Sequence, residues 1–417
     1  MTYSIQPHCR LCANDQLIDF FDLGSQALSG CFPGTGQASP PLAPLILCRC
    51  PNCHLVQLRH STDPAKMFTH EYGYQSSLNA AMSDHLHELQ SWITDRYSVT
   101  TNDLVIDIGA NDGTLLKAWS GFGVQRVAID PILDKFTHLY PKDIQQIADF
   151  FTSKHIGGIL AGRKAKIITS ISMFYDLPDP NDFVAGIASA LADDGVWILE
   201  QSYLPTMLAR NSFDTICHEH LEYYALKQIE WLADRYGLIV LDVALNDCNG
   251  GSFRLALGNK DGPWPQNTAA IARTQAIETK LALDTPAPYS AFARRVGSVK
   301  SETMDLLQEL KSEGKTIWIY GASTKGNVLL QHYGIDASLV EGVIEVNPEK
   351  FGHFTPGSNL PIRSETGILA ENPDYFLVLP WHFRENILAR GQVYLDAGVK
   401  FIFPLPNLEV IGANSGD

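Results

Sequence analysis

The sequence predicts an α/β protein in which a Rossmann-like domain lies between a small metal-binding domain and a second Rossmann-like unit. Two Cys-x-x-Cys pairs fall within the first 53 residues. From about residue 76 to 260, apolar runs typical of buried parallel strands alternate with amphipathic stretches, and the alternation restarts near residue 316. We therefore expect three domains, over residues 1–75, 76–265 and 266–417.

Charge and hydropathy exclude several classes of protein. The 417 residues carry a formal net charge of −15, whereas nucleic-acid-binding proteins normally present a basic face. The sequence contains no run of eighteen apolar residues, and its first residues lack the basic and apolar regions of a secretory signal. We expect a cytoplasmic monomer that binds neither nucleic acid nor membranes.

The first domain is rich in turn-forming residues and needs a crosslink, because it cannot bury a large core unaided. Its two Cys-x-x-Cys pairs supply four thiolates, a complete tetrahedral ligand set for a structural zinc ion: Cys9, Cys12, Cys50 and Cys53. The alternative is four reduced core cysteines. Cys48 lies near enough in the sequence to replace a ligand. The other cysteines lack partner spacing and are expected to be packed thiols: Cys31, Cys217 and Cys248.

The strands of both α/β units are predicted from short apolar runs. In the middle domain these runs are residues 104–108, 126–129, 166–169 and 196–199. In the last domain they are residues 316–320, 340–344, 375–379 and 400–403. Helical periodicity over 266–312, broken near 284–289, predicts a helical connector between the two units.

A glycine-rich turn follows the first strand of the middle domain, in the sequence Val105-Ile-Asp-Ile-Gly-Ala-Asn-Asp-Gly113. Glycines let the backbone approach a ligand closely, and Asp130 ends the next strand, where a carboxylate can accept ribose hydroxyls. The turn lacks the Gly-x-Gly-x-x-Gly pattern of nicotinamide enzymes. It resembles instead the first motif of class I methyltransferases, and Asp149-Phe-Phe151 resembles their adenine-binding step.

That resemblance implies S-adenosylmethionine as the cofactor. The residues it assigns to the cofactor are Asp107, Gly109, Asn111, Asp112, Gly113, Asp130, Asp149 and Phe150. The alternative is a Rossmann-like domain without a cofactor.

A segment dense in titratable groups, Cys217-His-Glu-His-Leu-Glu222, follows the last predicted strand of the middle domain. Carbon methylation beside a carbonyl needs a base, and a histidine titrates near neutral pH, with a neighbouring carboxylate able to orient it. The segment is not His-Glu-x-x-His, which excludes a zinc-peptidase helix. A catalytic metal on His218, His220 and Glu222, or a structural polar network, are the alternatives.

A second turn, Gly321-Ala-Ser-Thr-Lys-Gly326, joins a strand to a helix in the last domain. Asn327 stands where a P-loop requires lysine and then serine or threonine, so the turn is not a P-loop. A helix N-terminus with hydroxyls and a lysine nearby nevertheless suits an anion. The alternative is a structural strand–helix turn.

Together these motifs resemble the sugar C-methyltransferases that methylate carbon 3 of nucleotide-linked 4-keto-deoxyhexoses. Further motifs of the resemblance are Tyr72-Gly-Tyr-Gln-Ser-Ser77 and Ser212-Phe-Asp-Thr-Ile-Cys-His-Glu-His220. It implies His220 as general base beside Glu219, and a nucleotide-sugar between the middle and last domains with its diphosphate on the second turn. The chain departs from the family's type member at Cys217, where a tyrosine is expected, and at Asp176, where a histidine is expected.

The remaining assignments follow from the same resemblance. Residues expected to act in catalysis are His220, Glu219, Tyr72, Tyr74, Asp176 and His218. Residues expected to bind the sugar nucleotide are Tyr203, Glu222, Asn249, Gly321, Ser323, Thr324 and Lys325. The alternatives are O- or N-methylation of another small metabolite, or a zinc-ribbon binding protein with a non-catalytic methyltransferase core.

Overall fold

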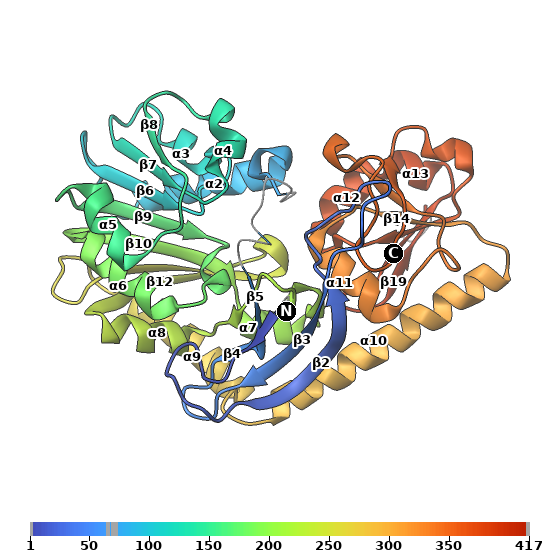
Figure 1. Cartoon of the computed structure of the whole chain (residues 1–417), viewed down its shortest axis with the longest axis horizontal. Helices are drawn as coiled ribbons and strands as arrows, with labels where there is room; N and C mark the ends of the chain where they lie inside the picture. The colour runs from blue at the N-terminus through green and yellow to red at the C-terminus, as the bar shows by residue number, and fades with distance from the viewer. Residues whose placement is uncertain (1–2, 64–66, 68–73, 414–417) are drawn as a thin grey trace.

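The computed structural model describes residues 3–63, 67 and 74–413. Figure 1 shows two α/β lobes, with the long strands of the N-terminal domain and a long helix running along the base between them. The mixed α/β fold with Rossmann-like parallel sheets confirms the predicted fold class. Among the described residues, no helix is both long and apolar enough to cross a membrane.

The N-terminal domain is built from antiparallel strands in two small sheets. Its strands are β1 (Tyr3–Ile5), β2 (Ile18–Ala27), β3 (Leu42–Arg49), β4 (Val56–Leu58) and β5 (His60–Thr62). The order β11-β4-β3-β2 includes a strand from the middle domain, β11 (Glu222–Tyr223), whereas β1 pairs with β5. The N-terminal domain is therefore joined to the middle domain through its sheet.

The middle domain is built on a seven-stranded sheet of order β12-β13-β10-β9-β6-β7-β8. Its strands are β6 (Leu104–Ile108), β7 (Gln125–Ile129), β8 (Ile144–Ile147), β9 (Ala165–Ile171), β10 (Leu191–Ser202), β12 (Leu238–Asn246) and β13 (Ser252–Asn259). The five strands from β8 to β10 are parallel, and β13 runs antiparallel to both β10 and β12. Alternate residues of β6 belong to different cores: Ile106 and Ile108 to one, Val105 to the other. The sheet is thus covered on both faces.

This domain has seven α-helices in the part that the structure describes, three of which begin at polar caps. They are α2 (Ala80–Thr94), α3 (Thr114–Ala118), α4 (Leu133–Phe136), α5 (Ser153–Leu160), α6 (Pro180–Ala190), α7 (Leu204–Ala209) and α8 (Leu226–Arg235). The side chains of Asn79, Thr152 and Asp179 accept hydrogen bonds from backbone amides at the starts of α2, α5 and α6.

Two helices, α9 (Thr268–Leu281) and α10 (Ala287–Ser312), form the predicted connector, with the break that the prolines impose. Phe20 and Phe21 of β2 pack against Tyr289 and Phe292 of α10. The helix therefore fixes β2 along the base of the molecule (Figure 1).

The last domain is a second α/β unit with a six-stranded sheet of order β16-β15-β14-β17-β18-β19. Its strands are β14 (Ile317–Tyr320), β15 (Val343–Glu345), β16 (Ile362–Ser364), β17 (Tyr375–Val378), β18 (Lys400–Phe403) and β19 (Glu409–Ile411). Its helices are α11 (Thr324–Tyr333), α12 (Arg384–Arg390) and α13 (Gln392–Asp396).

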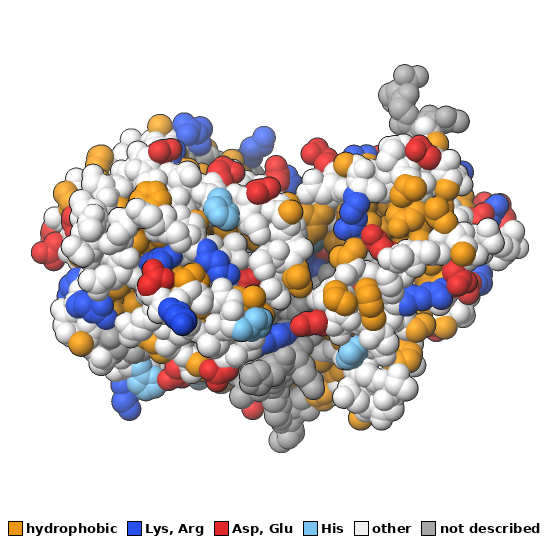
Figure 2. Space-filling model, turned by 90° about the horizontal axis from the view of Figure 1, so that it is seen from above, with side chains coloured by type: hydrophobic (Ala, Val, Ile, Leu, Met, Phe, Trp, Pro, Cys, Tyr) orange, Lys and Arg blue, Asp and Glu red, His pale blue; other side chains and the backbone are white. Residues whose placement is uncertain are grey.

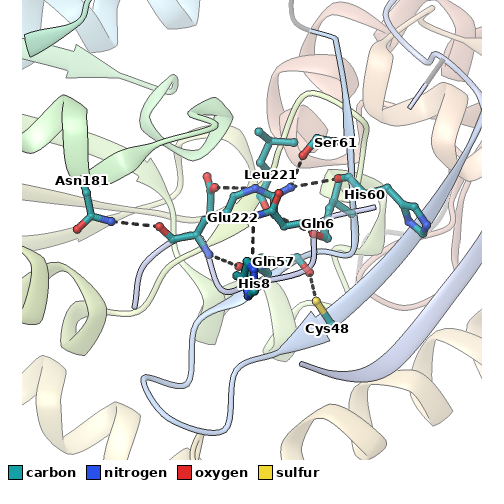
Figure 3. Close-up of polar contacts among 11 residues, drawn as sticks. Gln6, His8, Cys48, Gln57, His60, Ser61, Asn181, Leu221 and Glu222 are labelled. Carbon is teal, nitrogen blue, oxygen red and sulfur yellow. Dashed lines mark hydrogen bonds and ion pairs between the residues drawn. The ribbon is translucent and has the colours of Figure 1, made fainter. Parts of the chain in front are cut away.

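A buried arginine connects the N-terminal and middle domains. Arg10 Nη1 donates to the carbonyls of Leu58 (2.8 Å) and Leu221 (3.4 Å), and its Nη2 donates to Ser61 Oγ at 2.7 Å. Its Nε lies 3.5 Å from Glu222 Oε1, and neither side chain is exposed to solvent. Figure 3 shows Ser61, Leu221 and Glu222 close together in this network of contacts.

We expect Arg10→Met to lower the free energy of unfolding by about 3 kcal/mol, because it leaves the Glu222 carboxyl and the Leu58 carbonyl buried without their partner. The shift of the urea midpoint, followed by fluorescence, measures this loss. Arg59→Met is the matched control, since Arg59 pairs with the half-exposed Asp19 and should cost under about 1 kcal/mol. Equal shifts for the two variants would contradict the assignment.

Candidate functional site

A cavity of about 520 Å³ opens at the carboxyl ends of the parallel strands of the middle domain. This is where ligands bind in open α/β sheets, and the volume is typical of a small-molecule site. The cavity is lined by residues of the first glycine turn, of the loop before α2 and of the segment 171–183. Six of the residues assigned to the cofactor line it: Asp107, Gly109, Asn111, Asp130, Asp149 and Phe150.

The glycine turn has the backbone that its sequence requires. Gly109 and Gly113 have φ of +73° and +74°, in the left-handed region that favours glycine. A Cβ on Gly109 would lie 2.9 Å from Met173 Cγ on the opposite side of the turn. The two walls of the cavity therefore approach each other too closely for any larger residue.

Two carboxyl groups lie on the floor of the cavity. Asp130 accepts hydrogen bonds from the amides of Asn111 and Ile132, both at 2.9 Å, and so holds the turn in place. Asp107 accepts a hydrogen bond from Thr169 Oγ1 at 2.6 Å. Burial raises the pKa of Asp107 to about 7, in spite of the Thr169 hydrogen bond. Its protonation thus changes within the physiological range.

The loop before α2 is hydrogen-bonded to the first glycine turn through two side chains of that turn. Asn111 Oδ1 accepts from the amide of Ser76 at 3.0 Å, and Asp112 Oδ2 accepts from the amide of Ser77 at 2.9 Å. Asp112 therefore faces the loop and is absent from the residues lining the cavity. Tyr74 lines the cavity at the end of this loop. Tyr72, expected beside it, lies outside the described residues.

The four cysteines of the two pairs converge. Their Sγ atoms lie within 4.8 Å of one another, with Cys9 and Cys53 3.4 Å apart and Cys12 and Cys50 3.5 Å apart. Four thiolates at these separations fit a tetrahedral zinc ion, which the fold can hold without an open position. Cys48 is not part of the cluster; burial raises the pKa of its thiol to about 12.

His220 stands behind the wall of the cavity. Its Nδ1 lies 2.7 Å from the carbonyl of Thr215, so Nδ1–H donates there and Nε2 holds the lone pair. The ring packs against Tyr175 with 4.3 Å between centroids, and the adjacent Asp176 lines the cavity. Burial, with a smaller contribution from the charge of Lys325, lowers the pKa of His220 to about 3. The imidazole is therefore neutral at physiological pH.

The neighbours of His220 differ from the sequence-based expectation. The Thr215 carbonyl, rather than the Glu219 carboxylate, accepts the Nδ1 proton. Glu219 lies against Gly30 of the N-terminal domain, where a Cβ would be 2.6 Å from Oε1. His218 points away, with its Nε2 3.0 Å from the carbonyl of Ala43, and burial lowers its pKa to about 4. Both side chains fix the segment to the N-terminal domain.

Asp176 is a buried carboxyl at the cavity wall. Burial, and then the nearby carboxyls of Glu219 and Glu222, raise its pKa well above the ordinary value. The group is thus neutral and can donate a hydrogen bond, as well as accept one.

The second glycine turn reaches the middle domain through Lys325. Its Nζ donates to the carbonyl of Asn249 at 2.7 Å, and Asn249 Nδ2 donates to Ser172 Oγ, in the cavity wall, at 3.2 Å. Within the turn, Ser323 Oγ accepts the amide of Gly326, and Glu345 accepts the amide of Ala322. Part of the predicted anion site is therefore engaged by the protein itself.

Little free space surrounds the second glycine turn. A Cβ on Gly321, whose φ is +88°, would lie 2.9 Å from Pro380, and Thr324 lies near Gly30. Figure 2 shows the surface hollowed between the two lobes.

Two residues expected to bind substrate are buried against partners of their own chain. Tyr203 donates its hydroxyl hydrogen to Glu278 Oε1 at 2.8 Å. Glu222 faces Arg10. Both also line a void of about 10 Å³ behind His220, which has room for about one water molecule.

Several residues of the site were not singled out from the sequence. Arg10, Thr215 and Ser172 act through contacts with residues far away in the chain or through the backbone, so no spacing indicates them. Trp381 donates its Nε1 hydrogen to Asp214 Oδ2 at 2.8 Å and closes the contact between the two lobes. The approach of a tryptophan to a buried aspartate is likewise visible only in three dimensions.

Comparisons with known proteins agree with this arrangement. Residues 9–68 match the family model described as "Putative zinc binding domain", residues 74–243 match "Methyltransferase domain", and residues 247–406 match "C-methyltransferase C-terminal domain". The C-methyltransferase NovU of Streptomyces niveus is 31% identical over 411 residues, which cover 98% of this chain and 97% of the relative.

Two solved structures with detectable similarity are more distant. Magnesium protoporphyrin IX methyltransferase from Synechocystis, with S-adenosylmethionine bound, is 13% identical with a TM-score of 0.32, covering 42% of this chain and 78% of that one. The mitomycin 7-O-methyltransferase MmcR is 14% identical with a TM-score of 0.36, covering 44% and 55%.

The cavity, the glycine turn and the methyltransferase match define an S-adenosylmethionine-dependent methyltransferase with a zinc-binding domain. The chain belongs to the family of C-methyltransferases that includes NovU.

We expect the purified protein to contain about one zinc ion per chain, since four thiolates complete one site. Cys50→Ser should lose the metal, because it removes a ligand, and inductively coupled plasma mass spectrometry measures the content. Cys48→Ser should keep the metal, because Cys48 lies close to Cys50 in the sequence but outside the cluster. Loss of zinc in both variants, or in neither, would refute the ligand set.

We expect the affinity for S-adenosylmethionine to rise with pH through about 7. Its sulfonium and ammonium groups favour the ionised form of Asp107, so binding near pH 7 should release roughly half a proton. Calorimetry in buffers of different ionisation enthalpy measures this release. Asp107→Asn should abolish it, whereas Asp134→Asn, exposed on α4, should not. A binding enthalpy independent of buffer in the wild type would contradict this role of Asp107.

Proposed function

We propose that the acceptor is a nucleotide-linked 4-keto-deoxysugar, methylated on carbon 3 beside the ketone. The observation that supports this most directly is the junction of Asn249, Ser172 and Lys325. It brings the second glycine turn of the last domain to the wall of the cofactor cavity. An acceptor lying across this junction can present its anionic end to Lys325 and its reacting carbon to the cavity.

His220 is the proposed base for the proton on that carbon. The Thr215 carbonyl fixes the tautomer that leaves the Nε2 lone pair free for the proton. In the protein alone the pKa of His220 is low, first because of burial and then because of Lys325. A diphosphate paired with Lys325 would cancel that charge, so the acceptor itself would make His220 a stronger base.

The negative charge formed on the ketone oxygen needs hydrogen-bond donors. The neutral carboxyl of Asp176 is one proposed donor, since it lines the cavity and its Oδ1 makes no hydrogen bond among the described residues. Tyr74, which lines the same cavity, is another, and Tyr72 stays a prediction. Asn249, already bonded to Ser172, is placed to position the acceptor.

In the proposed reaction, His220 removes the proton on carbon 3 and the bonding pair forms an enolate with the ketone. When bound, S-adenosylmethionine would supply the electrophilic methyl group that the enolate carbon accepts, and it would leave as S-adenosylhomocysteine. The protein's contribution is alignment of the two reactants, removal of the proton and stabilisation of the enolate oxygen.

We expect His220→Ala to reduce the rate of methyl transfer to a thymidine diphosphate-linked 4-keto-deoxysugar by at least about 100-fold, which is typical of losing a general base. The same variant should keep its affinity for S-adenosylmethionine. Mass spectrometry of the sugar product and calorimetry of the cofactor measure the two effects.

Exchange of the carbon 3 proton with deuterated solvent, measured without cofactor, tests proton removal by the base separately from methyl transfer. The wild type should catalyse it and His220→Ala should not, while His87→Ala, exposed on α2, should behave like the wild type. Methyl transfer by His220→Ala at the wild-type rate would refute the base, and methylation of oxygen or nitrogen would refute the carbon acceptor.

A further inference from the structure

A thiol, an imidazole and a carboxyl converge at the end of the central sheet, outside the groups used so far. Cys248 lies in the short helical turn η5 (Cys248–Gly250), His85 in α2 and Glu200 in β10. One ligand atom of each lies within 4.8 Å of the other two. Glu200 lies 115 positions after His85 in the sequence, and Cys248 lies a further 48 positions along the chain. Only the fold brings these three residues together.

The three side chains are held in a chain of contacts. His85 Nε2 is bonded to Glu200 Oε1, and the His85 ring also bonds the Cys248 thiol. Glu200 Oε2 accepts from Arg254 Nε at 2.5 Å and from Asn246 Nδ2 at 3.1 Å. This is the thiol–imidazole–carboxyl order in which cysteine nucleophiles are activated.

The charges favour a reactive thiol over a metal site. Burial alone would lower the pKa of His85, but the contacts with Cys248 and Glu200 raise it to about 10. The protonated imidazole lies beside the thiol and can give its proton to a departing group. Arg254 Nη2 lies 3.5 Å from His85 Nε2, so a divalent cation at this point would meet a fixed positive charge.

The group borders the proposed acceptor site. Cys248 precedes Asn249, whose side chain bonds Ser172 in the cavity wall. The amide of Cys248 donates to Asn246 Oδ1 at 3.0 Å, and its carbonyl accepts from Ser252 Oγ at 2.9 Å. The backbone is therefore fixed, and Cys248 is half-buried, so a small reagent can reach a thiol that itself cannot move away.

We propose that Cys248 is a modification site for small hydroperoxides, activated by His85 and Glu200. The sulfur attacks one peroxide oxygen, a sulfur–oxygen bond forms and the oxygen–oxygen bond breaks. The sulfur is oxidised by two electrons to sulfenic acid, and the departing oxygen takes the proton of His85 and leaves as water or an alcohol. The added oxygen displaces the Asn249 turn and stops methyl transfer; this consequence rests on the proposed function, whereas the reactivity does not.

The test uses the full-length, zinc-loaded protein treated with hydrogen peroxide and dimedone, with peptide mass spectrometry of each cysteine. We expect Cys248 to be labelled at least about ten-fold faster than the half-buried Cys31 in the same sample. His85→Gln should slow labelling of Cys248 at least about ten-fold. Equal labelling of the two cysteines in the wild type overturns the proposal even if His85→Gln fails to fold.

Two further measurements separate the possible outcomes. Binding of a second equivalent of zinc that blocks labelling would show a metal site and overturn the proposal. Peroxide should stop methyl transfer in the wild type, reversibly with dithiothreitol, and leave Cys248→Ser active. If no 4-ketosugar is methylated by any variant, the proposed acceptor is wrong. The labelling result still shows whether Cys248 is the reactive thiol.

Discussion

The pairing of β4 with β11, closed by the buried Arg10 side chain, determines where the acid–base segment lies. The amide of Leu58 donates to the carbonyl of Leu221 at 2.9 Å, one residue after His220. Arg10 adds its own bond to that carbonyl and the ion pair with Glu222. Because Arg10 follows directly after Cys9, the cysteine cluster and the segment that carries the proposed base share one buried contact. A zinc ion held by the four cysteines would stabilise this contact without taking part in the chemistry of the proposed site.

Low local polarity decides the protonation states around this contact. Burial lowers the pKa of His220, so that its imidazole is neutral, and raises the pKa of Asp176 and of Glu219 above their ordinary values. Lys325 brings a positive charge from the last domain to this region. The proposed anionic acceptor would neutralise this charge and would thereby raise the pKa of the proposed base, His220.

The predicted strands and the helical connector agree closely with the structure, because long apolar runs and proline breaks are local signals. Three strands of the central sheet were not predicted: β8, β12 and β13. β8 is short and half-buried, and β12 at the antiparallel edge mixes buried with partly buried residues, so neither forms a continuous apolar run. The two residues of β11 are too few for any periodicity, and only their partner strand in the N-terminal domain makes them a strand.

By itself, the sequence determined the four zinc ligands, the cofactor turn and the order of the domains, since each depends on residues a few positions apart. Tertiary structure decided which group holds the ring of His220, because the Thr215 carbonyl leaves no trace in side-chain patterns. It also turned His218, Tyr203 and Glu222 toward structural partners, and it joined Asn249 to Lys325. These contacts depend on how the domains pack against one another. Residues far apart in the sequence contribute to the free energy of that packing, so a short sequence motif cannot predict it.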